Sequence, residues 1–432
     1  MKKVAFVTLG CKVNQYETNE LSALLAEYGY GTVGVNEDAD VYVVNSCCVT
    51  GESGRKSRQA VRRLRAAHPG AVIVLTGCFP QAFPEEAALN EADIIIGNRT
   101  NRKLPALLDC FFSKQEQRTL ILPHRREDPY DGVPIRDMRA HTRAFVKIQD
   151  GCNRYCTYCI IPKSRGFSRS RSPEDIRLEL SSLSKNGYRE IVFVGINLSA
   201  YGRDIGLTLA DAVRIAQEKP GIERVRLGSL EPDHITDDLI ETLAGMDKFC
   251  PQFHLSLQSG CDKTLKRMNR HYTAQEFAAL TAKLRDVFED VSLTTDVIVG
   301  FPGETEEDFA KSCDFVKEQR FMKVHIFPYS AREGTPAAGY PDQIPQEIKA
   351  ARASHLQAIC EPIRMECLRA LTGSVREVLF ETPKGGRQRG YTKNYTPVSV
   401  KSDEALCGRI LPVLITGTDG QQCTGELTAD TL

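Results

Sequence analysis

The sequence lacks a net charge, a long apolar run and the features of a secreted protein. Its 432 residues include 56 basic and 56 acidic side chains, so no overall electric field indicates a polyanionic partner. No apolar stretch has the length of a membrane-spanning helix, and the apolar run in "MKKVAFVTLGCKVNQ" is too short for a signal peptide. These absences predict a cytoplasmic protein without a membrane partner. The odd number of 15 cysteines then indicates thiols or metal ligands instead of disulfide bridges.

Apolar segments in the first part of the chain alternate with segments of helical periodicity. We expect strands in "KVAFVTLG", "DVYVVNS", "AVIVLTG" and "DIIIG", with helices between them. This alternation predicts a doubly wound α/β domain over residues 1–113. Residues 114–140 are polar, contain proline and show little periodicity, so we interpret them as a linker.

A second alternation follows, over residues 138–368. Six strands are expected, in "RAFVKIQ", "EIVFVG", "RVRLGS", "FHLSL", "VSLTTDVIVG" and "KVHIFP". Six βα units predict a partial (β/α)6 barrel, with its functional groups at the C-terminal ends of the strands. Residues 371–432 contain the short strand candidates "VREVLFE", "PVSVKS" and "RILPVLITG" and the turn-rich stretch "TPKGGRQRGYTKNY". That pattern predicts a small β-barrel.

Three cysteines follow the first expected strand of the second alternation, in "GCNRYCTYC". Three and then two residues separate Cys152, Cys156 and Cys159. A structural zinc site normally has four protein ligands, and the nearest downstream histidine, His234, is far away in the sequence. Three thiolates can instead hold a cubane iron–sulfur cluster and leave one iron open to a small chelating cofactor. The spacing favours such a cluster, with zinc or unrelated buried thiols as the alternatives.

Three further cysteines each follow an expected strand of the first domain. Cys11 comes after "KVAFVTLG", Cys47 after "DVYVVNS" and Cys78 after "AVIVLTG". Because the carboxyl ends of parallel strands meet at one edge of a sheet, three separate segments can present thiolates to one point. We therefore expect a second three-cysteine cluster here. Chance placement of buried cysteines is the alternative.

The CxxxCxxC loop followed by six βα units resembles the radical S-adenosylmethionine (SAM) superfamily. The segments "TLGCKVNQYET", "NSCCVT" and "TGC" resemble the N-terminal domain of the methylthiotransferases, and the resemblance covers the whole chain. It implies two [4Fe–4S] clusters, one on each cysteine group, and SAM chelated by the open iron at Cys152, Cys156 and Cys159. It assigns Cys47 as the ligand and leaves Cys48, which follows directly, as a competitor for the iron.

The same resemblance implies contacts with the cofactor. Tyr158, which precedes the last cysteine of the loop, is expected near the adenine. Gly195 and Asn197 are expected near the methionyl end, and Glu231 near the ribose hydroxyls. The expected pocket walls lie at the ends of later strands: Gln258, Asp296 and Gly300. The alternative for each residue is an ordinary core, turn or surface role.

Although the chain has no net charge, local clusters of basic residues predict a surface that binds RNA. Residues 151–173 contain several basic side chains and no acidic one, and residues 55–65 are rich in arginine. The C-terminal segment resembles a TRAM domain, a small RNA-binding β-barrel. Lysine and arginine contact phosphates, and aromatic rings stack on unpaired bases. The expected RNA contacts are Arg165, Arg169, Arg171, Lys384, Arg387, Arg389, Tyr391, Lys393 and Tyr395, with a solvated surface as the alternative.

The Cys11 segment resembles the methylthiotransferase branch that acts on N6-threonylcarbamoyladenosine next to the tRNA anticodon. The resemblance therefore implies a radical sulfur insertion that yields the 2-methylthio derivative, with no catalytic residue beyond the cluster ligands. The expected partners are the tRNA anticodon stem-loop, a sulfur donor and a one-electron reductant such as a flavodoxin. The alternatives are the same chemistry on isopentenyladenosine or on a ribosomal protein aspartate, a non-catalytic iron–sulfur RNA-binding protein and, more remotely, a zinc-based hydrolase.

Overall fold

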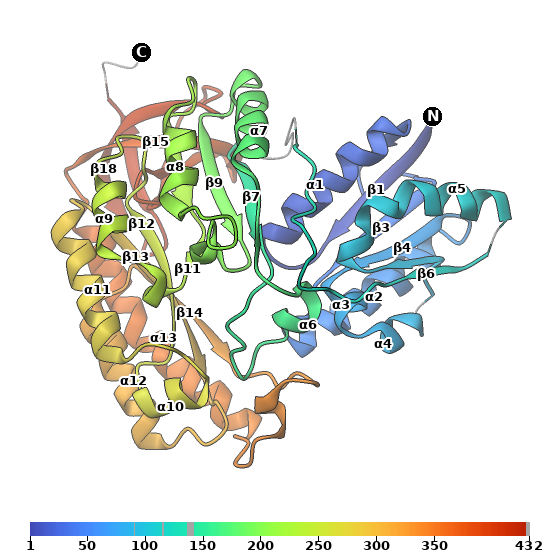
Figure 1. Cartoon of the computed structure of the whole chain (residues 1–432). Helices are drawn as coiled ribbons and strands as arrows, with labels where there is room; N and C mark the ends of the chain where they lie inside the picture. Colours follow the sequence, from blue (N-terminus) through green and yellow to red (C-terminus); the bar gives the residue numbers. More distant parts are fainter. Residues whose placement is uncertain (90, 115, 136–141, 429–432) are drawn as a thin grey trace.

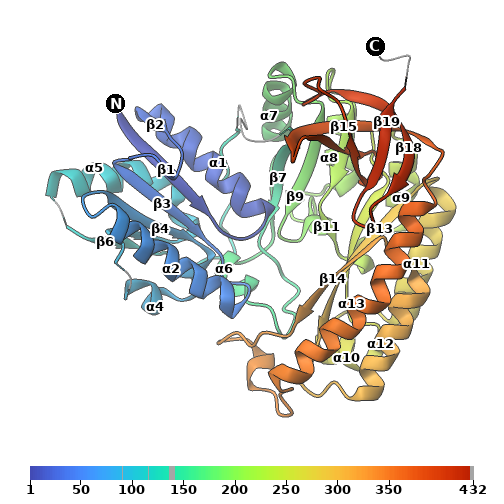
Figure 2. The same cartoon turned by 180° about the vertical axis from the view of Figure 1, so that it is seen from behind.

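The computed structural model of the chain describes residues 1–89, 91–114, 116–135 and 142–428. Its sheets form three units, and the first two face each other across the segment that joins them (Figure 1 and Figure 2). The expected start of the second unit at residue 138 and the expected chain end of the third at residue 432 lie outside the described residues. Within these ranges, no helix combines the length and the apolar character needed to cross a membrane.

The N-terminal unit is built on a six-stranded parallel sheet with the order β2-β1-β3-β4-β5-β6. Its strands are β1 (Lys2–Thr8), β2 (Tyr30–Thr32), β3 (Val41–Ser46), β4 (Val72–Gly77), β5 (Ile94–Ile96) and β6 (Arg118–Leu120). The order reverses between β1 and β3, because β2 lies on one side of β1 and all later strands lie on the other. In open α/β sheets, ligands bind at such a switch point, beyond the carboxyl ends of the strands.

Helices cover both faces of this sheet, as the expected doubly wound arrangement requires. They are α1 (Lys12–Glu27), α2 (Gly51–Ala67), α3 (Cys78–Ala82), α4 (Pro84–Ala88) and α5 (Leu104–Lys114), with the 3-10 helix η1 (Asn98–Lys103) before α5. Successive side chains of a strand point to opposite faces. Val41 and Val43 of β3 therefore pack in a core with α1 and α5, whereas Tyr42 and Val44 pack in a second core with α2.

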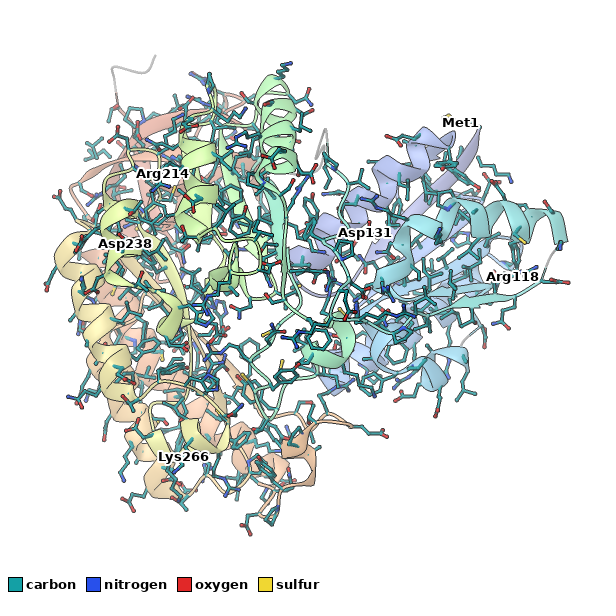
Figure 3. The ribbon with its side chains drawn as sticks, viewed as in Figure 1. Met1, Arg118, Asp131, Arg214, Asp238 and Lys266 are labelled. Atoms are coloured by element: carbon teal, nitrogen blue, oxygen red, sulfur yellow. The ribbon has the colours of Figure 1, made fainter. Side chains whose placement is uncertain are left out.

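The expected linker is partly wrong. Within it, β6 pairs in parallel with β5 and forms the edge of the N-terminal sheet, so this sheet continues beyond residue 113. The segment after β6 returns between the two units: Arg102 pairs with Asp131 at 2.6 Å, and Figure 3 shows Asp131 on the side of the N-terminal unit that faces the barrel. Residues 115 and 136–140 of the expected linker lie outside the described residues.

The second unit is an open barrel made of two four-stranded sheets, β10-β9-β7-β8 and β11-β12-β13-β14. Its strands are β7 (Ala144–Asp150), β8 (Arg169–Ser170), β9 (Glu190–Gly195), β10 (Arg224–Leu227), β11 (Ser229–Leu230), β12 (Gln252–Gln258), β13 (Ser292–Val299) and β14 (Lys323–Pro328). Only Gly228 separates β10 from β11, so the second sheet continues around the barrel from the first. All six expected strands are present, and β8 is an additional short strand that runs antiparallel to β7. The partial (β/α)6 barrel is confirmed.

The longer helices of this unit lie on the outside of the curved sheets (Figure 1). They are α7 (Pro173–Lys185), α8 (Leu209–Gln217), α9 (Asp237–Ala244), α11 (Ala274–Val287), α12 (Glu306–Gln319) and α13 (Gln346–Arg369). The shorter helices are α6 (Ile161–Arg165), which lies beside α3 of the N-terminal unit, α10 (Asp262–Arg267), and the 3-10 helices η2 (Leu198–Ala200), η3 (Pro232–His234) and η4 (Pro336–Gly339). Side chains such as Leu180, Phe277 and Leu356 pack from these helices into one continuous core with the strands. The helical covering leaves the inner face of the sheets open at the carboxyl ends of the strands.

The C-terminal unit is a closed barrel with the order β15-β16-β17-β19-β18, which confirms the expected small β-barrel. Its strands are β15 (Val375–Lys384), β16 (Arg387–Thr392), β17 (Pro397–Val400), β18 (Ile410–Thr418) and β19 (Cys423–Leu427). The stretch expected to be a turn contains β16, which pairs with β15 across the Gly385–Gly386 hairpin. The unit docks on the first sheet of the open barrel, where Arg224 and Arg226 of β10 donate hydrogen bonds to the carbonyl oxygens of Tyr391 and Thr392.

Candidate active site

The three N-terminal cysteines lie together at the switch point of the parallel sheet. Cys11 follows β1, Cys47 follows β3 and Cys78 begins α3 directly after β4. Gly10 has a φ of +112°, and a side chain there would meet the Cβ of Cys47 at 2.9 Å and its Sγ at 3.2 Å. The loop after β1 therefore rests directly on Cys47. Cys11 is exposed, whereas Cys47 and Cys78 are buried.

A hydrogen-bonded pair of asparagines fixes the loops that carry these cysteines. The Asn14 amide donates to Asn45 Oδ1 at 3.2 Å and to the Ser46 carbonyl at 2.9 Å, while the Asn45 amide donates to the Asn14 carbonyl at 2.8 Å. Gly77 has a φ of +97°, and a side chain there would meet the Ser46 carbonyl oxygen at 2.5 Å. A residue without a side chain is thus needed to bring the Cys78 loop this close to β3.

The second cysteine group occupies the loop after β7, and neighbouring segments hold that loop in place. The backbone N–H of Cys152 donates to the Gly166 carbonyl at 3.0 Å, and that of Thr157 donates to the Met268 carbonyl at 3.1 Å. The Asn269 amide donates to the Arg154 and Tyr155 carbonyls. These protein contacts hold the loop in place, and it presents Cys152, Cys156 and Cys159 from one short segment.

Two side chains from distant strand ends reach the sulfurs of this loop. The Asn197 amide points to Cys152 Sγ at 3.8 Å, and Arg270 Nη1 donates to Cys156 Sγ at 3.3 Å. The Asn197 Oδ1 atom is buried without a hydrogen-bond partner. A buried acceptor without a partner is costly unless a ligand satisfies it. This orphaned oxygen beside Cys152 fits the expected position of the methionyl end of SAM.

The N-terminal group has a cationic neighbour of its own, Arg165 at the end of α6. Arg165 is fully buried; its Nε donates to Cys78 Sγ at 3.1 Å, and its guanidinium forms a bidentate ion pair with Glu17 of α1. Lys147 bridges Glu17 at 2.7 Å and Asp150 at 2.8 Å. Despite burial, Lys147 and Arg169 hold the pKa of Asp150 well below its usual range. This network of ion pairs joins the two units, and through Arg165 it contacts the sulfur of Cys78.

This arrangement corrects the expectation that Arg165 and Arg171 bind RNA. Both side chains are completely buried, and Arg171 pairs with Glu179 of α7 at 2.5 Å. Arg169 is also largely enclosed and pairs with Asp150 at 3.1 Å. A run of basic residues without acidic neighbours in the sequence was misleading, because their acidic partners come from other elements.

The thiols differ in how readily they lose a proton. A hydrogen bond with Cys48 and the charge of Arg165 lower the pKa of Cys78 to about 7, against the opposing effect of burial. Burial and the neighbouring Cys156 raise the pKa of Cys159 to about 12. The hydrogen bond to Cys78 and burial raise the pKa of Cys48 well above its ordinary value. Cys78 therefore loses its proton more readily than Cys48, which is a neutral thiol beside it.

A cavity of about 260 Å3 lies between the segments that follow the two cysteine groups. Val49 and Thr50, just after Cys47 and Cys48, form one wall, and Cys159, Ile160 and Ile161 form another. The remaining lining comes from the barrel: Tyr158, Gln258, Asp296, Ile298, Phe327, Pro328, Tyr329 and Ser330. The backbone N–H of Gly51 donates to Ser330 Oγ at 3.2 Å, which links the two units at the edge of the cavity.

The residues expected to contact SAM are distributed unevenly around this site. Tyr158, Gln258 and Asp296 line the cavity. Glu231 forms an ion pair with Arg270 and lies 3.5 Å from Arg154, so its carboxylate already serves two cations. Gly195 lies against Gln149, whose Oε1 accepts the backbone N–H of Asn197 at 2.7 Å.

Gly300 does not belong to the cavity. A side chain at Gly300 would meet Lys349 Cγ of α13 at 2.4 Å, and the Gly300 amide donates to Glu304. Its expected role as a pocket wall stays a prediction. Sequence reasoning also missed Arg270, which lies after β12 and reaches both Cys156 and Glu231; no signal within its own segment points to either contact.

The expected RNA-binding side chains of the C-terminal unit fall into two sets. Lys384 is exposed, and Arg387 and Arg389 are half-buried. Tyr391 and Tyr395 stack on each other with ring centroids 4.5 Å apart, and the Arg143 guanidinium lies 4.9 Å from each ring. The Lys393 ammonium donates to the Asp247 carbonyl. The tyrosines and Lys393 thus contact the barrel unit, whereas Lys384 faces solvent.

Both cysteine groups fit an iron–sulfur cluster better than a zinc ion. Among the described residues, neither group has its three sulfurs within 4.8 Å of one another. A tetrahedral zinc ion with bonds of about 2.3 Å needs sulfurs about 3.8 Å apart. Three soft donors with wider spacing suit a cubane that keeps one iron open.

Comparisons with known proteins agree with this geometry. Residues 146–316 match the model of the Radical SAM superfamily, and residues 3–97 match the Uncharacterized protein family UPF0004. A threonylcarbamoyladenosine tRNA methylthiotransferase of Bacillus subtilis (strain 168), MtaB, is 38% identical, over 96% of this chain and 94% of that protein. A tRNA-2-methylthio-N(6)-dimethylallyladenosine synthase of Clostridium botulinum (strain Hall) is 35% identical, over 97% of this chain and 95% of that protein.

A solved structure shows the fold independently. The radical SAM methyltransferase TsrM of Kitasatospora setae, with cobalamin and a [4Fe-4S] cluster bound, has a TM-score of 0.57 at 13% identity and covers 78% of this chain and 77% of that one. SAM and iron–sulfur clusters are the cofactors of the superfamily, and each cysteine group of this chain fits one cluster. The chain therefore belongs to the radical SAM methylthiotransferase family.

Proposed function

We propose that the protein transfers a methylthio group to N6-threonylcarbamoyladenosine next to the anticodon of tRNA. The observation that carries the proposal is the cavity between the segments that follow the two cysteine groups, lined by Val49 and Thr50 from one unit and by Cys159 from the other. We propose that the carbon to be modified lies in this cavity, between the two groups. Insertion of sulfur at an unactivated carbon needs one group to activate the carbon and another to deliver the sulfur.

Cys152, Cys156 and Cys159 would hold the cluster that binds SAM. When bound, the cluster and SAM supply a one-electron reductive cleavage that generates a radical able to remove hydrogen from an adenine carbon. Asn197 offers its unpartnered Oδ1 and its amide beside Cys152, and Arg270 donates to Cys156. Outer contacts of this kind orient ligands and tune the metal. Tyr158 packs edge-on against Phe301 at 6.4 Å and walls the cavity.

Cys11, Cys47 and Cys78 would hold the second cluster, where sulfur is delivered. The lowered pKa of Cys78 favours its thiolate form, and the exposed Cys11 lies on the solvent side of the group. Apolar side chains such as Ile160, Ile298 and Phe327 restrict water in the cavity between the groups. The sulfur donor and the one-electron reductant, for which we expect a flavodoxin-like protein, would be separate partners.

The exposed face of α2 is the best-placed RNA contact. α2 begins at Gly51, directly after the cavity residues Val49 and Thr50. It exposes Arg55, Lys56, Arg62 and Arg63. Cationic side chains beside the cavity can hold phosphates of the anticodon stem-loop, and an unpaired loop base costs little to turn into a pocket. Lys384 of the C-terminal unit extends the proposed surface.

The relatives include both the threonylcarbamoyl and the dimethylallyl branches of tRNA methylthiolation. The Gln258 side-chain amide in the cavity wall can donate hydrogen bonds to the hydroxyl and carboxyl oxygens of a threonylcarbamoyl group, whereas an apolar dimethylallyl chain offers it no acceptor. Against a dimethylallyl chain that amide would lose its hydrogen bonds to water without gaining others, and such burial is costly.

The test uses anaerobically reconstituted protein with tRNA from cells that lack the gene. SAM, sulfide and dithionite are added, and the nucleosides are separated by liquid chromatography and identified by mass spectrometry. We expect 2-methylthio-N6-threonylcarbamoyladenosine to appear while N6-threonylcarbamoyladenosine decreases. Cys159→Ala and Cys47→Ala serve as matched variants, and each should retain one cluster and form no methylthiolated product.

Two results would contradict the proposal. Methylthiolation of isopentenyladenosine alone would assign the chain to the other branch. A protein with both clusters that releases no 5′-deoxyadenosine from SAM would favour a non-catalytic RNA-binding role.

A further inference from the structure

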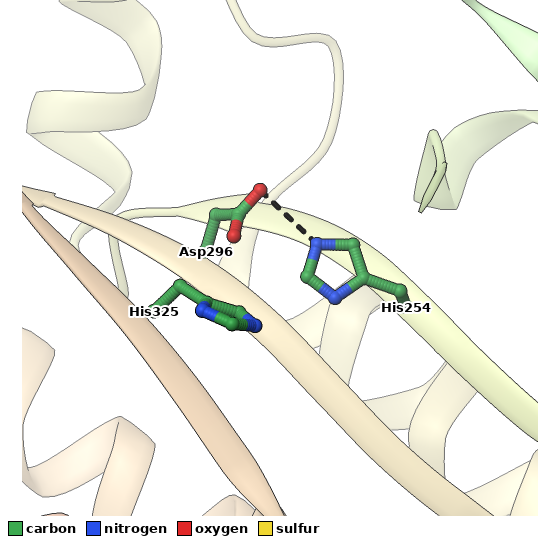
Figure 4. Close-up of side chains that lie close together, drawn as sticks. All are labelled: His254, Asp296 and His325. Carbon is green, nitrogen blue, oxygen red and sulfur yellow. Dashed lines mark ion pairs between the residues drawn. The ribbon is translucent and has the colours of Figure 1, made fainter. Parts of the chain in front are cut away.

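Two histidines and an aspartate converge inside the open barrel, and the aspartate lines the cavity. His254 lies on β12, Asp296 on β13 and His325 on β14, three neighbouring parallel strands. Asp296 is directly paired with His325 in the strand register, and His254 is paired with Thr294, two residues before Asp296. Figure 4 shows the three side chains pointing toward a common space.

The contacts of the group are those of a ligand set. The donor atoms of the three side chains all lie within 4.8 Å of one another, and His254 Nε2 lies 3.1 Å from Asp296 Oδ2. His254 Nδ1 is hydrogen-bonded to Thr294 Oγ1 at 2.9 Å. A hydrogen bond at one ring nitrogen fixes the ring and leaves the other nitrogen free to bind a metal. Among the described residues, the His325 ring has no hydrogen-bond partner and contacts the His254 ring edge-on at 5.7 Å.

We propose that His254, Asp296 and His325 bind one divalent first-row transition metal ion of the Zn2+ class. Two imidazoles and one carboxylate are a donor set for such ions. A tetrahedral ion with bonds of about 2.1 Å places its donors about 3.4 Å apart, so small side-chain rotations from the present positions close the site. Parallel strand pairing holds the three Cα atoms in place, which lowers the entropy that ordering the ligands would otherwise cost.

The position of the site determines where the open coordination position of the ion lies. Side chains two residues apart share one face of a strand. Asp296 shares its face with Ile298, and His325 with Phe327; both Ile298 and Phe327 line the cavity, as does Asp296 itself. With three protein ligands, at least one coordination position stays open on the side of the cavity. That position takes water or an oxygen donor of the molecule that the cavity holds.

The site is distinct from both cysteine groups in its chemistry. It contains no sulfur, so it does not compete for cubane clusters, which require thiolates. In the absence of an ion, the same residues form only an Asp–His pair with a second imidazole at its side. The inference does not depend on the substrate of the protein, because binding of the ion is measured without RNA.

The test loads zinc onto protein whose two clusters are already assembled. The protein is treated with a weak chelator, given two equivalents of Zn2+ and passed through a desalting column, after which zinc and iron are quantified by mass spectrometry. Zinc K-edge X-ray absorption then reports the ligand atoms, since Zn–N and Zn–O bonds of about 2.0–2.2 Å are distinct from Zn–S bonds of about 2.3 Å. The variants are His325→Gln, His254→Gln and Asp296→Asn, and the exposed His355 of α13 supplies the matched control, His355→Gln.

The wild type and His355→Gln are expected to retain one zinc per chain with nitrogen and oxygen neighbours. His325→Gln and His254→Gln are expected to lose at least four fifths of it while iron content and melting temperature stay unchanged. Equal zinc in wild type and His325→Gln, a shell of sulfur neighbours, or no zinc in the wild type would each overturn the proposal. If one histidine variant fails to fold, the zinc contents of the other histidine variant and of Asp296→Asn test the proposal.

Discussion

Arg165 Nε donates a hydrogen bond to Cys78 Sγ at 3.1 Å, although 87 positions separate the two residues. The same guanidinium is paired with Glu17 of α1, so a side chain from the barrel unit lies between a helix and a cysteine of the N-terminal unit. Hydrogen bonds to the atoms that ligate a metal orient the ligand and commonly change metal affinity by factors of 10–100. If Cys78 ligates a cluster as we propose, Arg165 is placed to orient its sulfur.

Replacing Arg165 should affect both stability and iron content. Arg165→Gln leaves Glu17 and Asp150 with fewer cationic partners in a buried region, and breaking such a pair costs about 3–5 kcal/mol. We expect a lower melting temperature and loss of about half of the iron after anaerobic reconstitution. Arg169→Gln is the matched control, because Arg169 also pairs with Asp150 but is not hydrogen-bonded to Cys78 among the described contacts. Equal iron content in the two variants would show that Arg165 does not support the cluster.

Cys48 and Cys78 should respond differently to substitution, although their side chains are hydrogen-bonded. Cys78→Ala is expected to remove one cluster, which is measured as a loss of about half of the iron and sulfide. Cys48→Ala should keep both clusters, because Cys48 is a buried neutral thiol within the apolar core. Loss of iron in Cys48→Ala comparable to that in Cys78→Ala would instead make Cys48 a ligand.

Glu20 should make stability depend on pH. Burial raises the pKa of its carboxyl to about 8, far above the value of about 4.5 in an unfolded chain. Between these values the folded state binds a proton that the unfolded state has released, so the stability contributed by this group falls as pH rises from 4.5 to 8. Glu20→Gln, which keeps an acceptor for the Val133 amide, should raise the melting temperature at pH 8 by several degrees and leave it unchanged at pH 4.5. A difference between variant and wild type that is the same at both pH values would contradict this assignment.

Substitutions of Tyr395 and Lys384 test two different roles of the C-terminal unit, its docking on the barrel unit and its binding of RNA. Tyr395 stacks on Tyr391, and Arg226 lies 4.6 Å from its ring. Tyr395→Ala should therefore lower the melting temperature by an amount that corresponds to about 3–5 kcal/mol, the usual range for loss of a packed aromatic side chain. Lys384→Ala should leave the melting temperature unchanged and weaken tRNA binding, measured by filter binding at two salt concentrations. If Lys384→Ala binds tRNA as tightly as the wild type, the exposed lysine is only solvated.

Local patterns in the sequence sufficed for the features that depend on neighbouring residues. The apolar periodicity predicted the six main strands of the open barrel but not the two-residue β8, and three cysteines at strand ends predicted one group because parallel strands end at one edge. β16 was missed because its buried positions hold Gln388, Gly390 and Thr392 and show no apolar alternation. β6 has three residues, too few to show a period.

Contacts between distant segments could not be read in the same way. Arg165 looked like a phosphate ligand because no acidic residue is near it in the sequence, whereas its partner Glu17 is 148 positions away. His254 and His325 stood in two expected strands, but only the register through β13 places them at the level of Asp296. The sequence alone therefore did not predict which charged side chains are buried or which distant residues are their partners.

The buried ions at the boundary between the first two units limit how relatives can be recombined. Glu17 comes from the N-terminal unit, while Lys147, Asp150 and Arg165 come from the barrel. A hybrid protein that joins the first unit of one family member to the barrel of another must inherit all four residues from compatible parents. A mismatch at any one of them would leave an unneutralised ion in the interior beside a cysteine ligand, so we expect such hybrids to fail in cofactor assembly before they fail in substrate selection.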